Sequence, residues 1–367
     1  MSDLEIAFCR KDEIDQLMEF VDRHWSSGHV LSRSKSLMDW QHYDERLGRY
    51  NFALAKTRKS PSILGMLGFI PTVRYDEKIH ERSNVIWLVN WKVIEGAGYA
   101  GLGLSLMSFV EKNIPWQAIG TVGNSDLVAP LYRAFGYQTG RLKHYYILNR
   151  KKTSFHLVGG AEASERPREP SSGRRKLKEV DENDLSELRR IAYDSDECSI
   201  PKKSVDYFEK RYLRHPFYDY KAYMVGANGE WEGILVIRPA EWKGSVALRL
   251  VDYFGPNGAL EGLGDEFQCL LDDHDAEYLD FYNHGIEPAQ MRRAGFSERT
   301  TEGEVVIPNH FEPFEFKNVE INFAIKVSKE IRGKAQVRLF KGDADQDRPN
   351  IDLSMNDAIA SSKKGNA

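Results

Sequence analysis

The sequence predicts an α/β protein with a mixed, mostly antiparallel twisted sheet flanked by helices. Two observations lead to this fold class. In the first half, several strand-like runs lead into a glycine-dense turn that opens an apolar helix. In the second half a similar order of elements returns. A chain of 367 residues is also long for one hydrophobic core. We therefore expect the fold to be present twice, with a degenerate second copy.

The first half, residues 1–150, contains each element of such a domain in order. Helical spacing covers residues 12–25, where Ile14, Leu17, Met18 and Val21 share one face, and a second helix is expected over 34–43. The remaining elements are strands at 51–55, 62–72, 84–93, 118–122 and 141–148, and helices at 103–112 and 129–135.

A polar stretch rich in arginine, glutamate and proline, residues 151–176, predicts an exposed linker. The second domain then covers residues 177–350, and the small, polar residues 351–367 predict a flexible tail. In the second domain, Ala294-Gly295-Phe296 repeats the pattern of Ala134-Phe135-Gly136-Tyr137. Helices are expected at 185–193, 262–272 and 288–294, and strands at 176–180, 220–226, 233–237, 246–254 and 277–282.

Composition excludes several classes of protein. A formal net charge of -4, with no basic stripe, argues against a nucleic-acid partner. No apolar run is long enough to span a membrane, and the first residues do not resemble a signal peptide. The three cysteines form no metal-binding or paired motif. We expect a cytoplasmic protein without a metal site, and a monomer is plausible.

The first chemical motif is the turn that follows the strand at 84–93. Gly98, Gly101 and Gly103 let the backbone approach a ligand, and the helix that follows presents its first N–H groups there. Such a helix start suits a pyrophosphate. A plain tight turn and a dinucleotide fingerprint are the alternatives. The fingerprint requires the loop after the first strand of a domain, whereas this one follows the third or fourth, which favours coenzyme A over NAD.

The second motif is Asn124-Ser-Asp-Leu-Val-Ala-Pro-Leu-Tyr132-Arg-Ala-Phe-Gly-Tyr137. With the glycine loop it resembles the GNAT superfamily of acyl-CoA N-acyltransferases, over residues 51–148. The resemblance implies the GNAT fold and acyl-CoA as co-substrate. This sequence departs from the family pattern at Gly98, where the family usually has Arg or Gln. The departure removes a side-chain contact to the pyrophosphate and leaves the backbone contacts.

The resemblance also implies roles for individual residues. Tyr132 would protonate the departing thiolate, although a core aromatic is the alternative for this position. A backbone N–H near Asn90 or Trp91 would stabilise the tetrahedral oxyanion. Asn124 would either cap the next helix or bond the pantetheine arm. The implied coenzyme contacts are Trp91, Val93, Gly98, Tyr99, Ala100, Gly101, Leu102, Gly103, Asn124 and Tyr132.

The acceptor amine must lose a proton, and histidines near the first helices are candidates for the base. His29 and His42, with Trp40, lie in the region that shapes the acceptor pocket in this family. We place His29 first because it follows Gly28 in a predicted loop. A carboxylate or a water could serve instead, and an ordinary surface histidine is the alternative for each.

Two strings in the second half suggest acceptor binding. His284 ends a predicted strand, and residues 341–350 form a polar string that includes Asp345, Asp347 and Arg348. We expect Arg348 to pair with a phosphate and the two carboxylates to contact sugar hydroxyls or an amine. A solvated loop is the alternative. An EF-hand is excluded because its distal glutamate is missing.

The whole layout resembles two-domain N-acyltransferases of bacterial surface-polysaccharide (lipopolysaccharide or capsule) synthesis. These acylate a nucleotide-linked amino sugar, as in the transfer of 3-hydroxybutyryl to dTDP-3-amino-3,6-dideoxygalactose. The implied substrates are an acyl-CoA, 3-hydroxybutyryl or acetyl, and a dTDP- or UDP-amino sugar. Two other readings stay open: a tandem-GNAT peptidyl or aminoacyl transferase, and a non-catalytic nucleotide- or glycan-binding module.

Overall fold

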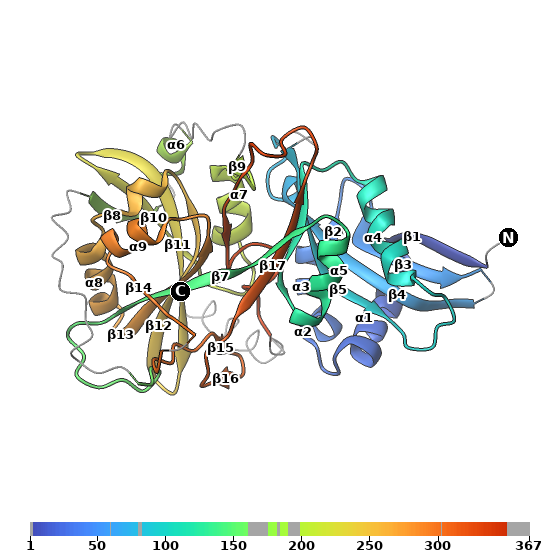
Figure 1. The fold of residues 1–367 in the computed structure, drawn as a ribbon, viewed down its shortest axis with the longest axis horizontal. Coiled ribbons are helices and arrows are strands. Elements are labelled where there is room, and N and C mark those ends of the chain that lie inside the picture. The colour runs from blue at the N-terminus through green and yellow to red at the C-terminus, as the bar shows by residue number, and fades with distance from the viewer. Residues whose placement is uncertain are drawn as a thin grey trace, which may run out of the picture. The chain divides into compact units, whose positions relative to one another are not determined.

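The computed structural model describes residues 3–58, 60–79, 83–160, 175–181, 184–189, 199–301 and 303–350 (Figure 1). The predicted tail and residues 161–174 of the predicted linker lie outside these ranges. Within the part of the chain that is described, no helix is long and apolar enough to cross a bilayer.

Contacts divide the chain into two compact units. Unit 1 holds the residues up to Thr121 together with the chain from Arg348 onward, and unit 2 holds Val122–Asp347. The division falls within β6 (Ala118–Asn124), earlier than the boundary predicted near residue 150. The reason is β7 (Gln138–Leu148), which pairs antiparallel with β13 of the second half, from Tyr278↔Leu148 to Asn283↔Lys143.

Unit 1 is built on four antiparallel strands in the order β1-β3-β4-β5, with β6 parallel to β5. The strands are β1 (Leu4–Arg10), β3 (Arg49–Thr57), β4 (Ser60–Pro71) and β5 (Val85–Val93). The helices are α1 (Ile14–Phe20), α2 (Val30–Arg33), α3 (Lys35–His42) and α4 (Leu102–Asn113). The predicted order of elements in this half is confirmed.

The two faces of this sheet carry different helices. On one face, Phe109 of α4 packs on Phe8, with ring centroids 4.9 Å apart, and Phe8 in turn contacts Phe69 of β4. On the other face, His42 of α3 packs on Phe52 of β3 at 4.4 Å. The mixed sheet therefore lies between α4 and the α1–α3 group.

Local capping explains where α3 begins and ends. The Ser34 side chain accepts a hydrogen bond from the N–H of Leu37, as an N-cap residue should. At the other end, the Arg74 guanidinium donates to the backbone carbonyls of Asp39, Trp40 and Tyr43. These bonds add side-chain donors to the carbonyls at the end of the helix, and so fix the helix against the sheet.

Unit 2 repeats the plan of unit 1. Its sheet runs in the order β17-β7-β13-β12-β11-β10-β8, and α8 connects the parallel pair β12 and β13 just as α4 connects β5 and β6. The second copy is therefore confirmed. The strands are β8 (Arg175–Glu179), β10 (Lys221–Ala227), β11 (Glu230–Trp242), β12 (Ser245–Phe254), β13 (Ala276–His284), β17 (Ile321–Val327) and β19 (Leu339–Phe340). The helices include α5 (Ala129–Ala134), α6 (Leu185–Leu188), α7 (Val205–Phe208), α8 (Gly264–Asp273) and α9 (Pro288–Arg293).

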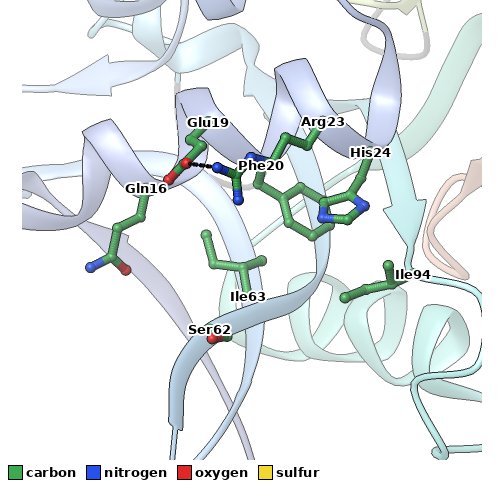
Figure 2. Close-up of a pocket in the computed structure, with 8 residues that line it drawn as sticks. All are labelled: Gln16, Glu19, Phe20, Arg23, His24, Ser62, Ile63 and Ile94. Atoms are coloured by element: carbon green, nitrogen blue, oxygen red, sulfur yellow. Dashed lines mark ion pairs between the residues drawn. The ribbon is translucent and has the colours of Figure 1, made fainter.

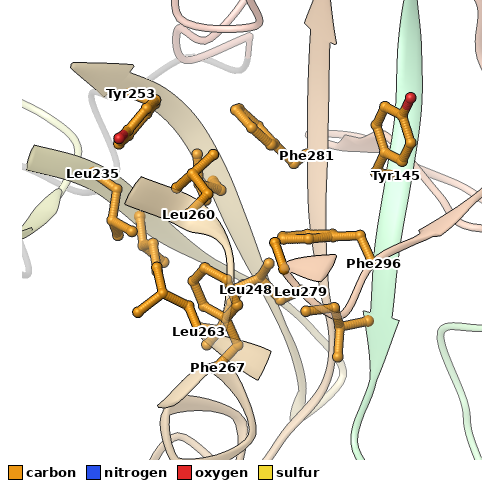
Figure 3. Close-up of a cluster of buried hydrophobic side chains, with 14 of the residues drawn as sticks. Tyr145, Leu235, Leu248, Tyr253, Leu260, Leu263, Phe267, Leu279, Phe281 and Phe296 are labelled. Atoms are coloured by element: carbon orange, nitrogen blue, oxygen red, sulfur yellow. The ribbon is translucent and has the colours of Figure 1, made fainter. Parts of the chain in front are cut away.

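The core of unit 2 lies between this sheet and α8. Phe267 of α8 packs edge-on against Phe296, with centroids 5.3 Å apart, and both are surrounded by strand residues such as Leu248 and Leu279 (Figure 3). Burying such aromatic and aliphatic side chains stabilises a domain by about 1.5–3 kcal/mol each. The second copy thus has a complete hydrophobic core of its own.

The first part of the predicted linker is exposed at residues such as Lys151, Thr153 and Ser154, but it is anchored at one point. Leu157 and Val158 are buried in a small cluster with Ala247 and Tyr278, and Gly159 bridges to Val306. Two apolar residues in a polar stretch were enough to anchor the chain, because they cover the end of the sheet. The buried pair 157–158 is the exception to the exposed linker that was predicted, and residues 161–174 lie outside the described residues.

Candidate functional site

The end of β5 carries a β-bulge at Asn90. Leu67 of β4 pairs with Trp91 and the next residue, Gly68, pairs with Val89, so Asn90 is an extra residue without a partner. Its φ of 48° lies in the left-handed region, which asparagine tolerates better than most residues. Bulges of this kind re-aim the backbone next to functional sites.

On its opposite edge, β5 stops pairing with β6 close to the same place. The parallel ladder between β5 and β6 covers only three pairs and ends at Trp87↔Gly120, although β5 continues to Val93. The two strands therefore diverge after Trp87. Beyond Trp87, the backbone groups on this edge of β5 are not part of that ladder, which is the condition for pairing with an extended ligand.

The glycine loop follows directly. Gly98 and Gly101 have φ values of 78° and 74°, and a Cβ placed on either would meet open space. Gly101 is the N-cap residue of α4, so the first N–H groups of a 12-residue helix face this loop. The loop therefore has the open backbone and helix start predicted for a pyrophosphate site.

Gly103 has a second reason to be a glycine, besides the one expected. A Cβ at this position would lie 3.1 Å from the ring of Trp91. The glycine therefore allows the Trp91 indole to pack on α4, and the contact of Gly103 with a coenzyme stays a prediction. The sequence could not distinguish these two reasons for a glycine.

The second copy contains a bulge at the corresponding place in its sheet, but the strand edges around it are paired differently. Val236 pairs with Asp252 and Ile237 pairs with Leu250, so Val251 is the extra residue of β12. The parallel ladder to β13 is longer here, with five pairs. Val251 is therefore the counterpart of Asn90.

The chain itself occupies the edges next to this second bulge. We call residues 339–343 the closing segment. Its strand β19 pairs with Asn283 and His284 of β13, and the N–H of Gly342 donates to the carbonyl of Val251 at 2.7 Å. A Cβ on Gly342 would lie 2.2 Å from the Tyr212 hydroxyl oxygen, so only glycine fits. In the first copy, no comparable backbone bond to Asn90 is present among the described residues.

Residues 341–347 are largely buried, in contrast to the solvated or substrate-binding loop that was expected. Asp347 is 1% exposed, and its carboxylate accepts two hydrogen bonds from Arg238, at 2.8 and 2.9 Å, and one from the Tyr220 hydroxyl at 2.7 Å. Burial alone would raise the pKa of Asp347, but the charges of Arg238 and Lys341 outweigh it and hold the pKa well below its usual value. This carboxylate is committed to the fold and is not available to a sugar.

A second buried ion cluster anchors the closing segment. The Lys203 ammonium contacts Asp252 at 2.7 Å and Asp343 at 2.9 Å, and Asp252 also accepts from the Tyr212 hydroxyl at 2.6 Å. Burial raises the pKa of Asp343 even though Lys203 opposes it. Charges this deeply buried are stable only with such partners, so the cluster fixes the path of the chain.

The predicted residues on α5 and β6 belong to unit 2. Tyr132 is 4% exposed, its ring lies edge-on to that of Tyr137 at 5.1 Å, and burial raises its pKa, which keeps the hydroxyl protonated. Asn124 does not cap α5, because the N-cap residue is Val128. The Asn124 side-chain oxygen is instead buried without a hydrogen-bond partner, which leaves the predicted ligand contact open.

Two predicted residues that are far apart in sequence meet in unit 1. Nη2 of Arg348 lies 3.1 Å from Nε2 of His29, and Nδ1 of His29 accepts from the N–H of Leu31 at 3.2 Å. His42 is fully buried, and burial together with the charge of Arg74 lowers its pKa to about 3, so this imidazole is neutral. Trp40 is half-buried, with its ring 6.1 Å from that of Tyr75.

The two remaining predicted residues lie in unit 2. His284 packs on Phe323 at 4.6 Å and pairs with Leu339 of the closing segment, and burial lowers its pKa. Asp345 is half-buried. Acceptor binding by His284 and Asp345 stays a prediction.

Unit 1 contains a cavity of about 360 Å³ (Figure 2). The sequence analysis did not predict this cavity. Phe20, Ile63 and Ile94 supply its apolar lining, and Ile94 is the residue between β5 and the glycine loop. The polar lining includes Glu19 and Arg23, which form an ion pair at 2.6 Å. The volume and mixed lining are typical of a small-molecule site. Among the described residues, no cluster of three or more metal-ligating side chains is present.

The sequence matches no family model and no curated relative. Solved structures do resemble the chain. A GCN5-related N-acetyltransferase from Anabaena variabilis is 11% identical, with 88% of this chain and 72% of that chain covered and a TM-score of 0.53. A protein from Enterococcus faecalis, described as a probable N-acyltransferase, is 10% identical, with 89% and 72% covered and a TM-score of 0.51. The chain therefore has the fold of the GCN5-related N-acetyltransferases, as predicted.

Proposed function

We propose that the protein is an acyl-CoA-dependent N-acyltransferase whose thioester-binding site is in the first copy. The observation that carries the proposal is the contrast between the two bulges. At Val251 the chain supplies its own bonding partner. At Asn90 none of the described residues pairs with this edge of the strand beyond Trp87, and the strand leads into an open glycine loop. An extended acyl-CoA arm with a pyrophosphate fits an open strand edge that ends at a helix start.

In this reaction the amine nitrogen bonds to the thioester carbonyl carbon, and the carbon–sulfur bond breaks. The backbone N–H of Asn90 or Trp91 would stabilise the oxyanion that forms in between. Tyr132 would donate its proton to the departing thiolate, and the amine's proton would pass to water or to a side chain. The acyl-CoA is a co-substrate, and the chain's residues bind, orient and move protons around it.

For the acceptor we propose the amine of a nucleotide-linked amino sugar, with acetyl or 3-hydroxybutyryl as the acyl group. Arg348 would pair with a phosphate of the nucleotide, and His29, Trp40 and His42 would line the acceptor side. Asp347 no longer belongs to this set, because Arg238 and Tyr220 hold its carboxylate. Asp345 remains the candidate carboxylate of the string.

A thiol-release assay tests the proposal directly. The full chain is incubated with acetyl-CoA or 3-hydroxybutyryl-CoA and a panel of dTDP- and UDP-amino sugars, and free CoA thiol is measured. We expect thiol release that depends on one of the sugars. Binding of CoA by calorimetry without turnover of any amine would instead favour a non-catalytic module. Turnover that requires an aminoacyl-tRNA would favour a tandem-GNAT peptidyl or aminoacyl transferase.

A further inference from the structure

Two N–H donors of β5 have no hydrogen-bond partner among the described residues. They are Nε1 of Trp87, a residue that is 1% exposed, and Nδ2 of Asn90, a residue that is 8% exposed. Buried donors in folded proteins are nearly always paired, because an unpaired donor loses its hydration and gains nothing in return. Two such donors within four residues of one strand therefore call for an explanation.

One face of β5 is occupied by α4. Leu88 pairs with Phe69, whose ring packs on Phe8 and thereby under Phe109 of α4. Trp91 packs on Gly103, which also belongs to α4. Leu88 and Trp91 thus point to the α4 face.

One donor lies on the other face. Side chains alternate along a strand, so Trp87 points away from the α4 face. Val89 opposes Gly68, over which the ring of Phe52 lies, and Phe52 packs on His42 of α3. Trp87 therefore belongs to the α1–α3 face of the sheet, and Asn90 is the extra residue of the bulge that follows Val89.

The second copy shows that these donors are not required by the fold. Counting from the bulge, Leu248 stands in place of Trp87 and Val251 in place of Asn90, and both are fully buried apolar residues. At these two positions the second copy, whose bulge is bonded to its own chain, therefore has no side-chain donor. The copy with the open strand edge has two.

We propose that the Trp87 indole and the Asn90 side-chain amide determine acceptor specificity by donating hydrogen bonds to oxygen atoms of the amine substrate. The acceptor is then an oxygen-bearing amine, such as an amino alcohol or amino sugar, and not a plain alkyl or aryl amine. This inference rests on the proposed acyltransferase function. Both nitrogens are shielded from solvent before binding, so neighbouring side chains must move as the acceptor enters.

A matched pair of amines tests the turnover side of the inference. The probes are trans-2-aminocyclohexanol and cyclohexylamine, which differ by one hydroxyl group, with acetyl-CoA as donor and rates compared per unprotonated amine. We expect kcat/KM for the amino alcohol to exceed that for cyclohexylamine by about tenfold or more, because a site built for a hydroxyl rejects the analogue that lacks it. The ratio should fall toward one in Asn90→Gly and in Trp87→Phe.

The variants are chosen to spare the backbone. Asn90→Gly keeps the positive φ of the bulge and the backbone N–H of residue 90. If Asn90→Gly does not fold, Asn90→Asp is used in its place, because aspartate has the same shape but no side-chain N–H donor. Asn228→Gly is the matched control, since Asn228 also has a positive φ, of 54°, in a turn of unit 2. Trp116→Phe is the second control, because its indole N–H already donates to the Glu111 carbonyl. Both controls should keep the wild-type ratio.

A binding measurement separates this inference from the proposed function. With indole ¹⁵N-labelled tryptophan, the N–H signal of Trp87, assigned through Trp87→Phe, should move downfield with the amino alcohol in the presence of CoA and stay in place with cyclohexylamine. Turnover without preference and without this shift would overturn the inference and leave the acyltransferase proposal standing. The shift without any turnover would support the hydrogen bond from Trp87 to the amino alcohol and would contradict the acyltransferase proposal. Ordered waters that remain on both nitrogens in a crystal structure with bound amino alcohol would also overturn it.

Discussion

Nη2 of Arg348 lies 3.1 Å from Nε2 of His29. The hydrogen bond that His29 makes through its other ring nitrogen determines which nitrogen carries the proton. Because Nδ1 accepts a hydrogen bond from the N–H of Leu31, a neutral imidazole carries its proton on Nε2. Two N–H donors then face one another. That arrangement suits an anionic oxygen that accepts from both N–H groups better than it suits proton abstraction from an amine, and we expect acceptor binding rather than general-base catalysis for His29.

Substitution of Arg348 should therefore weaken acceptor binding selectively. We expect Arg348→Ala to raise KM for the sugar nucleotide about ten- to hundredfold, because one charge-assisted contact contributes roughly 1.5–3 kcal/mol. KM for acyl-CoA should stay near its original value. Arg348→Lys, which keeps the charge, should lie in between. A rise in KM for acyl-CoA alone would contradict the assignment, and simple unfolding in a thermal melt would make Arg348 structural.

His29→Asn provides a separate check. Asparagine is a good N-cap residue, so α2 should keep its start, while the imidazole is removed. If His29 binds the acceptor, KM for the sugar nucleotide rises and kcat changes little. A fall in kcat of about 10²-fold or more at saturating substrate would restore the general-base role.

Adding a charge at Ala100 in the glycine loop should change the affinity for CoA. A negative charge should lower it and a positive charge should not. We expect Ala100→Asp to raise the Kd for CoA at least several-fold, measured by calorimetry, because a carboxylate at this helix start repels the pyrophosphate. Ala100→Lys should not weaken binding. Since the closing segment occupies the second bulge, the stoichiometry should be one CoA per chain. Equal effects of the two substitutions would remove the loop from the site.

Tyr132→Phe tests the proton donor. The ring is retained, so packing against Tyr137 should survive, and only the hydroxyl is lost. We expect kcat to fall by about 10²-fold or more while the Kd for CoA barely moves. A variant with wild-type turnover would show that the ring only packs, or that water supplies the proton.

Burial of Lys341 should appear in the pH dependence of stability. Burial, followed by the charge of Arg249, lowers the pKa of Lys341 to about 7, below the ordinary value near 10.4. Between these values the unfolded chain binds a proton that the folded chain does not, so the free energy of unfolding contributed by this group rises with pH. The slope is at most about 1.4 kcal/mol per pH unit. Lys341→Met should remove this component from urea unfolding curves measured between pH 7 and 10. An unchanged slope would mean that Lys341 stays charged in the fold.

Local patterns predicted much of the fold, because they depend on neighbours in sequence. The spacing of Ile14, Leu17 and Val21 and the glycines around residue 101 produce a helix and a loop whatever else the chain does. The bulge at Asn90 depends on β4, and its one local signal is an asparagine, a residue that tolerates positive φ.

The burial of residues 341–347 could not be predicted in this way. The partner of Asp347 is Arg238, which lies 109 residues away. The residues near Asp347 in the sequence do not indicate that contact. A polar string reads as a solvated loop unless its counter-charges are known. The same holds for Lys203, whose partners Asp252 and Asp343 come from distant parts of the chain.

The closing segment also has a consequence for synthesis. It follows every other strand of unit 2, and β13 and the Val251 bulge obtain their last backbone partners from it. During translation these strand edges therefore stay unpaired until nearly all of the unit has left the ribosome, and unpaired edges are sites of aggregation. A chain that stops before residue 339 would retain the whole glycine loop and Tyr132, yet it would present an open sheet to chaperones and proteases.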